Sequence, residues 1–199
     1  PLYGIPILIK DNIDALPMST TAGSAAFKNN IPNNDSFLVK RLKEKGALIL
    51  GKVNLSEWAY YFCQNCPLGY SALGGQTLNP YGRKIFETGG SSSGSGVAVA
   101  ANYSVAAIGS ETSGSILSPS GKNSVVGLKP TIGSISRNGI IPISSSLDTA
   151  GPMAKSVMDT AILMNAFIGL DINDEYSYNS KPIFYQGLDT VTLEGKSFG

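Results

Sequence analysis

The chain has 199 residues, 42% of them hydrophobic, and a formal net charge of +1, which suits one domain with an apolar core and argues against nucleic acid or anionic lipid as a partner. Histidine is absent, which excludes Ser-His-Asp and Cys-His catalytic groups and every zinc site that needs imidazole. No apolar run is long enough to cross a membrane and no targeting motif is present, so we expect a cytoplasmic protein without a metal or other cofactor. Hydrolytic chemistry would then need Lys, Asp, Glu or Tyr as its base.

The first part of the chain predicts a strand, a helix and a second strand. The apolar, β-branched run at 4–10 indicates a buried strand that ends at Lys10, and a turn-rich loop follows it. The amphipathic residues 33–46 predict a helix that Asp35 caps. Residues 47–54 predict another buried strand, and this order favours a right-handed crossover and a parallel sheet.

Beyond residue 54 the sequence predicts shorter elements separated by loops. Gly, Ser and Pro are frequent at 110–124 and at 146–153, which indicates loops there. The regular elements that we expect are a short helix at 54–62, a helix of small residues at 95–103, a strand at 104–109 and a closing helix at 156–169 with Ser156 as its cap.

The end of the chain differs in composition from the rest. Residues 171–199 are polar and rich in tyrosine, and we expect them to form a weakly packed tail behind a single domain that spans 1–199. The first residue is not Met and the chain stops at EGKSFG, so we expect the ends to be cuts within a larger protein.

Cys63 and Cys66 are the only cysteines, with two residues between them. A thioredoxin-like pair would open a helix after a strand, whereas the residues that follow, 67–69, have the composition of a loop. Two ligands do not complete a zinc site. We therefore expect two reduced cysteines without a special role.

Residues 89–96 are all Gly or Ser, and three interpretations of this run compete. A flexible linker would need flexible flanks, whereas residues 97–101 are small and apolar, as in a buried helix. A phosphate-binding loop would need GxxxxGK[ST] or GxGxxG after a strand, which this run lacks. We favour a close-packed turn into a helix N-terminus, whose free N–H groups suit a developing negative charge.

A second Ser/Gly cluster, at 109–120, follows a predicted strand. The helix and strand between the clusters would let them fold against each other, which would bring Ser91 near Ser115. Lys10 is the plausible base at a buried strand end. A lysine that ends a strand is usually solvated, but one in a desolvated pocket has a lowered pKa and can act as a base.

Six blocks of the sequence resemble the amidase signature family in their residues, order and spacing. The blocks NLSEWA, SSSGS and SETSGSILSPS are most similar to the bacterial peptide-amidase-like branch and less similar to the A-type subunits of tRNA-dependent amidotransferases. The resemblance implies an α/β fold with a mixed, largely parallel central sheet that helices cover on both faces. The six blocks are GIPILIKDNID (4–14), GKVNLSEWAYYF (51–62), GYSALGGQTLNPYG (69–82), GGSSSGSGVAVAA (89–101), GSETSGSILSPS (109–120) and VVGLKPTIGSISRNGIIPISSSLDTAGPM (125–153).

The resemblance also implies a Ser–cis-Ser–Lys triad that hydrolyses a carboxamide through an acyl-enzyme. Ser115 would be the nucleophile, and Ser91, after a cis peptide bond, would bridge it to Lys10. Neutral Lys10 would draw the proton through Ser91 and later return it to the leaving amine. Such a mechanism needs no histidine.

The resemblance implies further roles for the residues around the triad. Ser92 would support the triad by hydrogen bonding, and Asp11 and Asn12 would belong to the layer behind Lys10, although loop capping explains these two equally well. The oxyanion hole would consist of the backbone N–H groups of Thr112, Ser113, Gly114 and Ser115.

The sequence departs from the family pattern in places. The family usually has Gly or Asp where Ser113 stands, so a carboxylate that could orient the loop is lost. Lys122 and Ser124 stand where small residues and often Gly are expected.

The chain is also less than half as long as most members of the family. Three functions therefore stay open: a serine amidase, a non-catalytic fragment that acts as a binding module, and the A-type subunit of an amidotransferase. As partners we expect a small-molecule amide, and neither nucleic acid nor a membrane. Exposed sheet edges favour self-association or the binding of a missing C-terminal complement.

Overall fold

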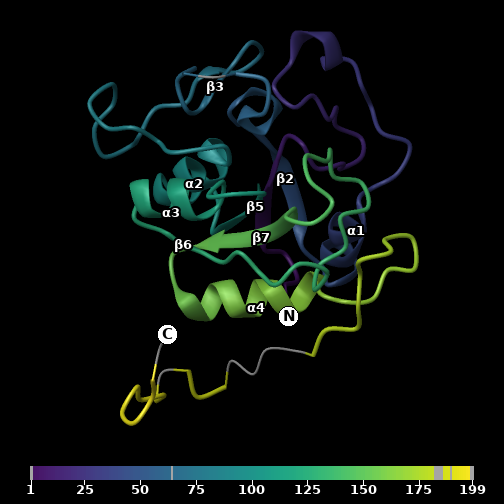
Figure 1. The fold of residues 1–199 in the computed structure, drawn as a ribbon, viewed down its shortest axis with the longest axis vertical. Coiled ribbons are helices and arrows are strands. Elements are labelled where there is room, and N and C mark those ends of the chain that lie inside the picture. The colour runs from purple at the N-terminus through teal and green to yellow at the C-terminus, as the bar shows by residue number, and fades with distance from the viewer. Residues whose placement is uncertain (1, 64, 182–185, 189, 198–199) are drawn as a thin grey trace.

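The computed structural model describes residues 2–63, 65–181, 186–188 and 190–197. Its centre is a five-stranded sheet with the strand order β2-β1-β5-β7-β6 (Figure 1). β1 is parallel to β2 and β5, whereas β7 is antiparallel to β5 and to β6. This is the expected mixed α/β sheet, and its three parallel strands lie together at one side.

The predicted elements occur in the predicted order, and the structure adds further ones, two of which are discussed below. The strands are β1 (Pro6–Lys10), β2 (Leu48–Val53), β3 (Tyr70–Ser71), β4 (Gly75–Gln76), β5 (Ala106–Glu111), β6 (Val126–Gly127) and β7 (Thr149–Ala154). The α-helices are α1 (Phe37–Glu44), α2 (Ser93–Ala100), α3 (Leu117–Lys122) and α4 (Val157–Phe167). Among the described residues, none of these helices has the length and apolar character needed to cross a membrane.

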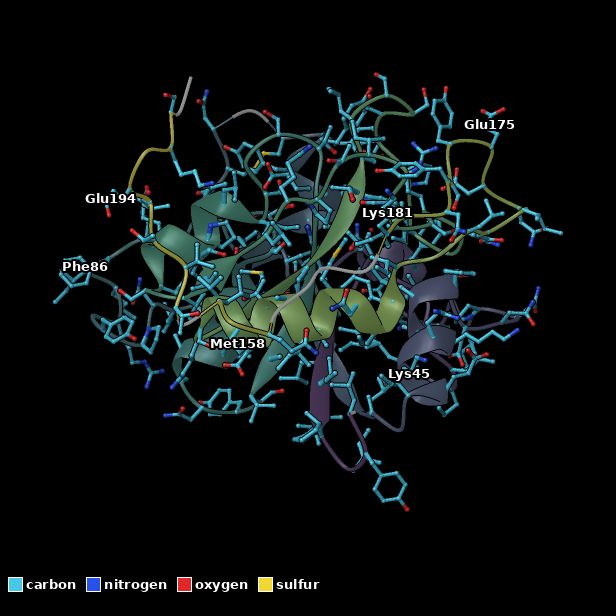
Figure 2. All side chains as sticks on the ribbon, turned by 90° about the horizontal axis from the view of Figure 1, so that it is seen from below. Lys45, Phe86, Met158, Glu175, Lys181 and Glu194 are labelled. Carbon is cyan, nitrogen blue, oxygen red and sulfur yellow. A yellow bond between two sulfur atoms is a disulfide. The ribbon has the colours of Figure 1, made fainter. Side chains whose placement is uncertain are left out.

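Helices cover both faces of the sheet. α1 and α4 pack against each other under one face, and α2 and α3 lie over the other (Figure 1). Figure 2, seen from the side of α4, shows this helix lying across the sheet. Because side chains alternate along a strand, Ile7 and Ile9 of β1 join the core of α1 and α4, while Leu8 packs with Ala98 and Val99 of α2.

Of the two predicted helix caps, one is wrong and the other is confirmed. The prediction for Asp35 is wrong, because the hydroxyl of Ser36 accepts the hydrogen bond from the N–H of Val39 (3.4 Å) and caps α1. Asp35 instead forms an ion pair with Lys43 (2.7 Å). At α4 the predicted cap, Ser156, is confirmed.

Two segments that were predicted as loops contain regular structure. Residues 110–124 include α3, in which Pro119 stands in the first turn, where a helix needs no N–H donor. Residues 146–153 include most of β7, where Pro152 lacks an N–H but its carbonyl accepts from the N–H of Leu128 (3.1 Å). Pairing with neighbouring strands outweighs the local composition in β7.

The strand β2 was predicted to be buried, but it lies at the edge of the sheet. Its side chains alternate between exposed and partly buried, and Leu50 is 56% exposed. The pairing with β1 shifts between Ile7 and Leu8, whose partners are Ile49 and Gly51. Leu50 is therefore an extra residue, a bulge in the edge strand.

The segment after β2 differs from the prediction in two ways. The helix expected at 54–62 is reduced to a short 3₁₀ segment at Glu57–Tyr60, which is kinked where Trp58 and Ala59 have positive φ angles. Cys63 and Cys66, expected to be reduced, form a disulfide. Their Cα atoms lie 5.8 Å apart, which is within disulfide range.

The start of the C-terminal tail is packed more tightly than predicted. Asp171 and Asp174 are 5% and 9% exposed. Asp171 accepts from the hydroxyl of Ser136 (2.6 Å), and Asp174 accepts from the N–H of Arg137 (2.8 Å) and forms an ion pair with its guanidinium (3.0 Å). These bonds anchor the beginning of the segment to the loop between β6 and β7, which composition alone did not predict.

Candidate active site

Lys10 is the last residue of β1 and is fully buried. Alternation along the strand puts it on the same face as Leu8, the face that α2 covers. Its Nζ donates to the Oγ of Ser91 (2.7 Å) and to the carbonyl oxygen of Ser110 (3.0 Å). Two of the predicted site residues, Lys10 and Ser91, are thus in direct contact.

The surroundings of Lys10 favour its neutral form. Burial lowers the pKa of Lys10 from 10.5 to about 7, because the charged amine loses its hydration. The carboxylates of Glu111 and Asp148 act in the opposite direction, since negative charge favours the protonated amine. None of the ion pairs in the described part of the chain includes Lys10. A substantial fraction of Lys10 is therefore neutral near pH 7, the state that a proton acceptor needs.

The first Gly/Ser cluster forms the turn into α2, as the sequence predicts. The peptide bond between Gly90 and Ser91 is cis. The Oγ of Ser92 donates to the carbonyl of Ser110 (3.0 Å) and accepts from its N–H (3.2 Å), and the N–H of Ser92 donates to the carbonyl of Ser115 (3.1 Å). Ser92 thereby ties the start of α2 to the end of β5 and to the second Ser/Gly cluster.

Ser115 and Ser91 line the same cavity, which has a volume of about 360 Å³. The loop at 112–115 forms one wall, and Tyr61 and Ile143 belong to the rest of the lining. Within the described residues, no hydrogen bond joins the hydroxyls of the two serines. The structure thus places Ser91 and Ser115 at one cavity and joins Lys10, which is not among the cavity's lining residues, to Ser91 by a hydrogen bond.

The loop before Ser115 is held by two carboxylates. The N–H of Gly114 donates to Glu111 (2.8 Å), so the expectation that Gly114 offers a free oxyanion donor is not met. The hydroxyl of Thr112 donates to Asp148 (2.5 Å). The second oxygen of Asp148 accepts from the N–H of Ile143 (2.7 Å), which links the loop to the opposite cavity wall.

Sequence reasoning assigned no role to Glu111 or Asp148. Each is an isolated acidic residue in a block of small, neutral residues, SETSGS and SSSLDTAG. A carboxylate in such a block often accepts hydrogen bonds from nearby backbone N–H groups. This signal could have marked both residues as hydrogen-bond acceptors, without identifying the groups that they bind.

Asp11 and Asn12 support the residues around Lys10. Asp11 forms an ion pair with Lys52 (3.1 Å) and accepts from the hydroxyl of Thr21. The side-chain amide of Asn12 donates to the Oγ of Ser110 (2.9 Å), on the residue whose carbonyl holds Lys10. These contacts fix the segment that follows β1.

A larger cavity, of about 530 Å³, adjoins the first at Thr112 and Ile143. Arg137, Asp148 and Asp174 are among its charged lining residues. In the residues that the structure describes, no group of three or more Cys, Asp or Glu side chains could hold a metal ion.

Comparison with known proteins gives concordant matches. The model of the Amidase family matches residues 1–192. A probable amidase of Arabidopsis thaliana is 44% identical, over 100% of this chain and 40% of its own length. The A subunit of the glutamyl-tRNA(Gln) amidotransferase of Lawsonia intracellularis is 41% identical over 100% of this chain and 40% of its own. The native peptide amidase of Stenotrophomonas maltophilia has a similar structure, with a TM-score of 0.89 and 54% identity over 93% of this chain and 38% of that one. The chain thus spans about 40% of the length of these relatives.

Proposed function

Because the chain belongs to the amidase family, we propose that it hydrolyses a carboxamide C–N bond to an acid and an amine or ammonia, with Ser115, Ser91 and Lys10 as its catalytic residues. The observation that carries this proposal is the 2.7 Å contact between buried Lys10 and Ser91, beside a cavity that Ser115 also lines. The structural likeness to a peptide amidase supports the reaction class.

In the proposed acylation step, the Oγ of Ser115 attacks the amide carbonyl carbon. Its proton passes to the Oγ of Ser91, whose own proton passes to the neutral amine of Lys10. The lowered pKa of Lys10 suits this role, because a base works best when its pKa lies near the working pH. Backbone N–H groups of the loop at 112–115 stabilise the oxyanion of the tetrahedral intermediate.

The tetrahedral intermediate then collapses, and the C–N bond breaks. Lys10 returns its proton through Ser91 to the leaving nitrogen, which departs as an amine or ammonia. A water molecule attacks the acyl group on Ser115, with the same two residues accepting and returning the proton. The acid is released and the hydroxyl of Ser115 is restored.

A fluorophosphonate probe and a panel of simple amides test this proposal. We expect the probe to label Ser115, and the folded protein to release ammonia or amine from at least one amide. Ser115→Ala should lose both reactions, whereas Ser146→Ala, a change at an exposed serine, should lose neither. A folded wild-type protein that neither reacts with the probe nor hydrolyses any amide would contradict the proposal.

A non-catalytic role is the second candidate, and it is favoured by the lack of a hydrogen bond between the hydroxyls of Ser91 and Ser115 among the described residues. Here the chain would keep the fold around the site and act as a binding module, and equal trace activity in the wild type and Ser115→Ala would support it. The A-type component of an amidotransferase complex is a third candidate, which the similarity to such a subunit supports. Stable co-purification with the other components of such a complex would favour the amidotransferase form.

A further inference from the structure

Glu111 is a buried carboxylate at the end of β5, with 4% of its surface exposed. One of its oxygens accepts from the N–H of Gly114 (2.8 Å). The other accepts from the N–H groups of Ile116 (2.6 Å) and Leu117 (3.0 Å). Among the described residues, no Lys or Arg forms an ion pair with Glu111. Three backbone donors, from the loop at 112–115 and from the start of α3, therefore compensate the burial of this carboxylate.

The same loop contains backbone donors that Glu111 does not bind. In the described part of the chain, the N–H groups of Thr112, Ser113 and Ser115 have no acceptor, unlike that of Gly114. All four residues line the cavity that Ser91 also lines. The loop thus contains one set of N–H groups that bind the carboxylate and another set that is free.

We propose that Glu111 is a positioning residue, which binds the N–H groups of Gly114, Ile116 and Leu117 and so orients the free N–H groups of Thr112, Ser113 and Ser115 toward the substrate oxyanion. This inference rests on the amide hydrolysis proposed above. Glu111 itself touches no reacting atom. Its bonds lie on both sides of Ser115 in the chain, at 114 and at 116–117, so they fix the nucleophile from two directions.

A carboxylate suits this position better than an amide would. It offers two acceptor oxygens, and the three N–H groups use both of them. In Glu111→Gln one oxygen becomes an NH₂ group, which would face a backbone donor and leave it without an acceptor.

Steady-state kinetics on Glu111→Gln test the proposal, with Glu111→Asp as the conservative variant and Glu87→Gln as a matched control, since Glu87 is exposed. We expect kcat to fall by about 10²-fold in Glu111→Gln, the usual effect of disturbing an oxyanion donor, with KM changed by less than about threefold. Glu111→Asp should recover part of the loss, and Glu87→Gln should match the wild type.

The pH dependence of kcat distinguishes positioning through this carboxylate from general loosening of the fold. The charge of Glu111 raises the pKa of Lys10, so its removal should move the rising limb of the profile to lower pH. An unchanged kcat in Glu111→Gln would overturn the proposal. A fall in kcat that Glu111→Asp does not recover and that leaves the limb in place would also overturn it.

Amide hydrogen exchange provides a readout that does not need turnover. We expect the amides of Gly114, Ile116 and Leu117 to exchange slowly in the wild type and at least about tenfold faster in Glu111→Gln, without a matching change in α4. Equal exchange in both proteins would overturn the role of Glu111. An inactive wild type that shows the expected exchange pattern would instead overturn the hydrolysis while leaving the loop arrangement intact.

Discussion

The two faces of the central sheet bury different kinds of side chain. Toward α1 and α4 the core is apolar, and Ile9, Leu42 and Phe167 in it are fully buried. Toward α2 the apolar cluster is much smaller, and buried polar side chains such as Lys10 and Ser92 lie beside it. Because burying a polar group is unfavourable unless it is hydrogen-bonded, the second face depends on specific contacts more than on burial. The difference indicates that stability and site chemistry lie largely on opposite sides of the sheet.

The largest effect should come from Lys10→Met on the polar face. Methionine keeps a similar length but accepts no proton, so we expect kcat for an amide to fall by about 10²- to 10⁴-fold while the fold persists. In the wild type, kcat should rise with pH through about 7 as Lys10 loses its proton. The surface variant Lys40→Met serves as the control in the same assay. If Lys10→Met kept full activity, the conclusion that catalysis depends on this face of the sheet would be wrong.

Phe167→Ala should have the largest effect on the apolar face. Truncating a fully buried phenyl ring leaves a cavity, and we expect the free energy of unfolding to fall by about 3–5 kcal/mol. Urea denaturation measures this loss, and Leu170→Ala, at a residue that is 54% exposed, should cost less than about 1 kcal/mol. Similar losses in the two variants would contradict the stabilising role given to this face.

A smaller effect should appear in the pH dependence of stability. The pKa of Lys10 is about 7 in the folded protein and near 10.5 when unfolded, so between these values the unfolded chain binds more protons. The free energy of unfolding should therefore rise with pH across this window. Below pH 7 the full cost of burying the protonated amine of Lys10 is present. Denaturation at several pH values should show a flatter dependence in Lys10→Met. Identical slopes would mean that burial of Lys10 does not oppose folding.

The smallest expected effect is at the cap of α4. The Oγ of Ser156 accepts from the N–H of Asp159 (3.0 Å), and Ser156→Ala should lower the free energy of unfolding by about 1 kcal/mol. Thermal denaturation would detect this loss, and Ser156→Asp should avoid most of it. Hydrolytic activity should stay unchanged, since this helix lies on the face opposite Lys10.

The sequence predicted those parts of the fold whose local pattern agrees with their environment. β1, α1, α2 and α4 have a clear apolar periodicity or composition, and the structure contains all four. β7 was missed because Gly151 and Pro152 suggest a loop, while its pairing with β5 and β6 comes from distant segments. Asp35 and Ser36 are both good caps, and only the backbone geometry decides between them.

The candidate site residues could be predicted from sequence motifs. The residues that hold them in place were harder to predict. The resemblance to the amidase signature family implied the contact between Lys10 and Ser91, and the structure contains this contact. The order of residues in the chain carries no information on which N–H groups of a loop are already bonded. The bond from Gly114 to Glu111 could therefore not be foreseen. The same holds for Asp148, whose partner Thr112 lies 36 residues earlier in the chain.

The bulge in β2 decides where Lys52 lies relative to the buried Lys10. Lys52 stands opposite Ile9 because Leu50 has no partner in β1. If Leu50 were paired with Leu8 instead of bulged, Lys52 would stand opposite Lys10, and two amines would compete for one poorly hydrated space, where each would repel the other's proton. In the actual register Lys52 reaches Asp11 (3.1 Å) instead. The bulge at Leu50 in the edge strand thus keeps the charged Lys52 from standing opposite Lys10, the candidate base.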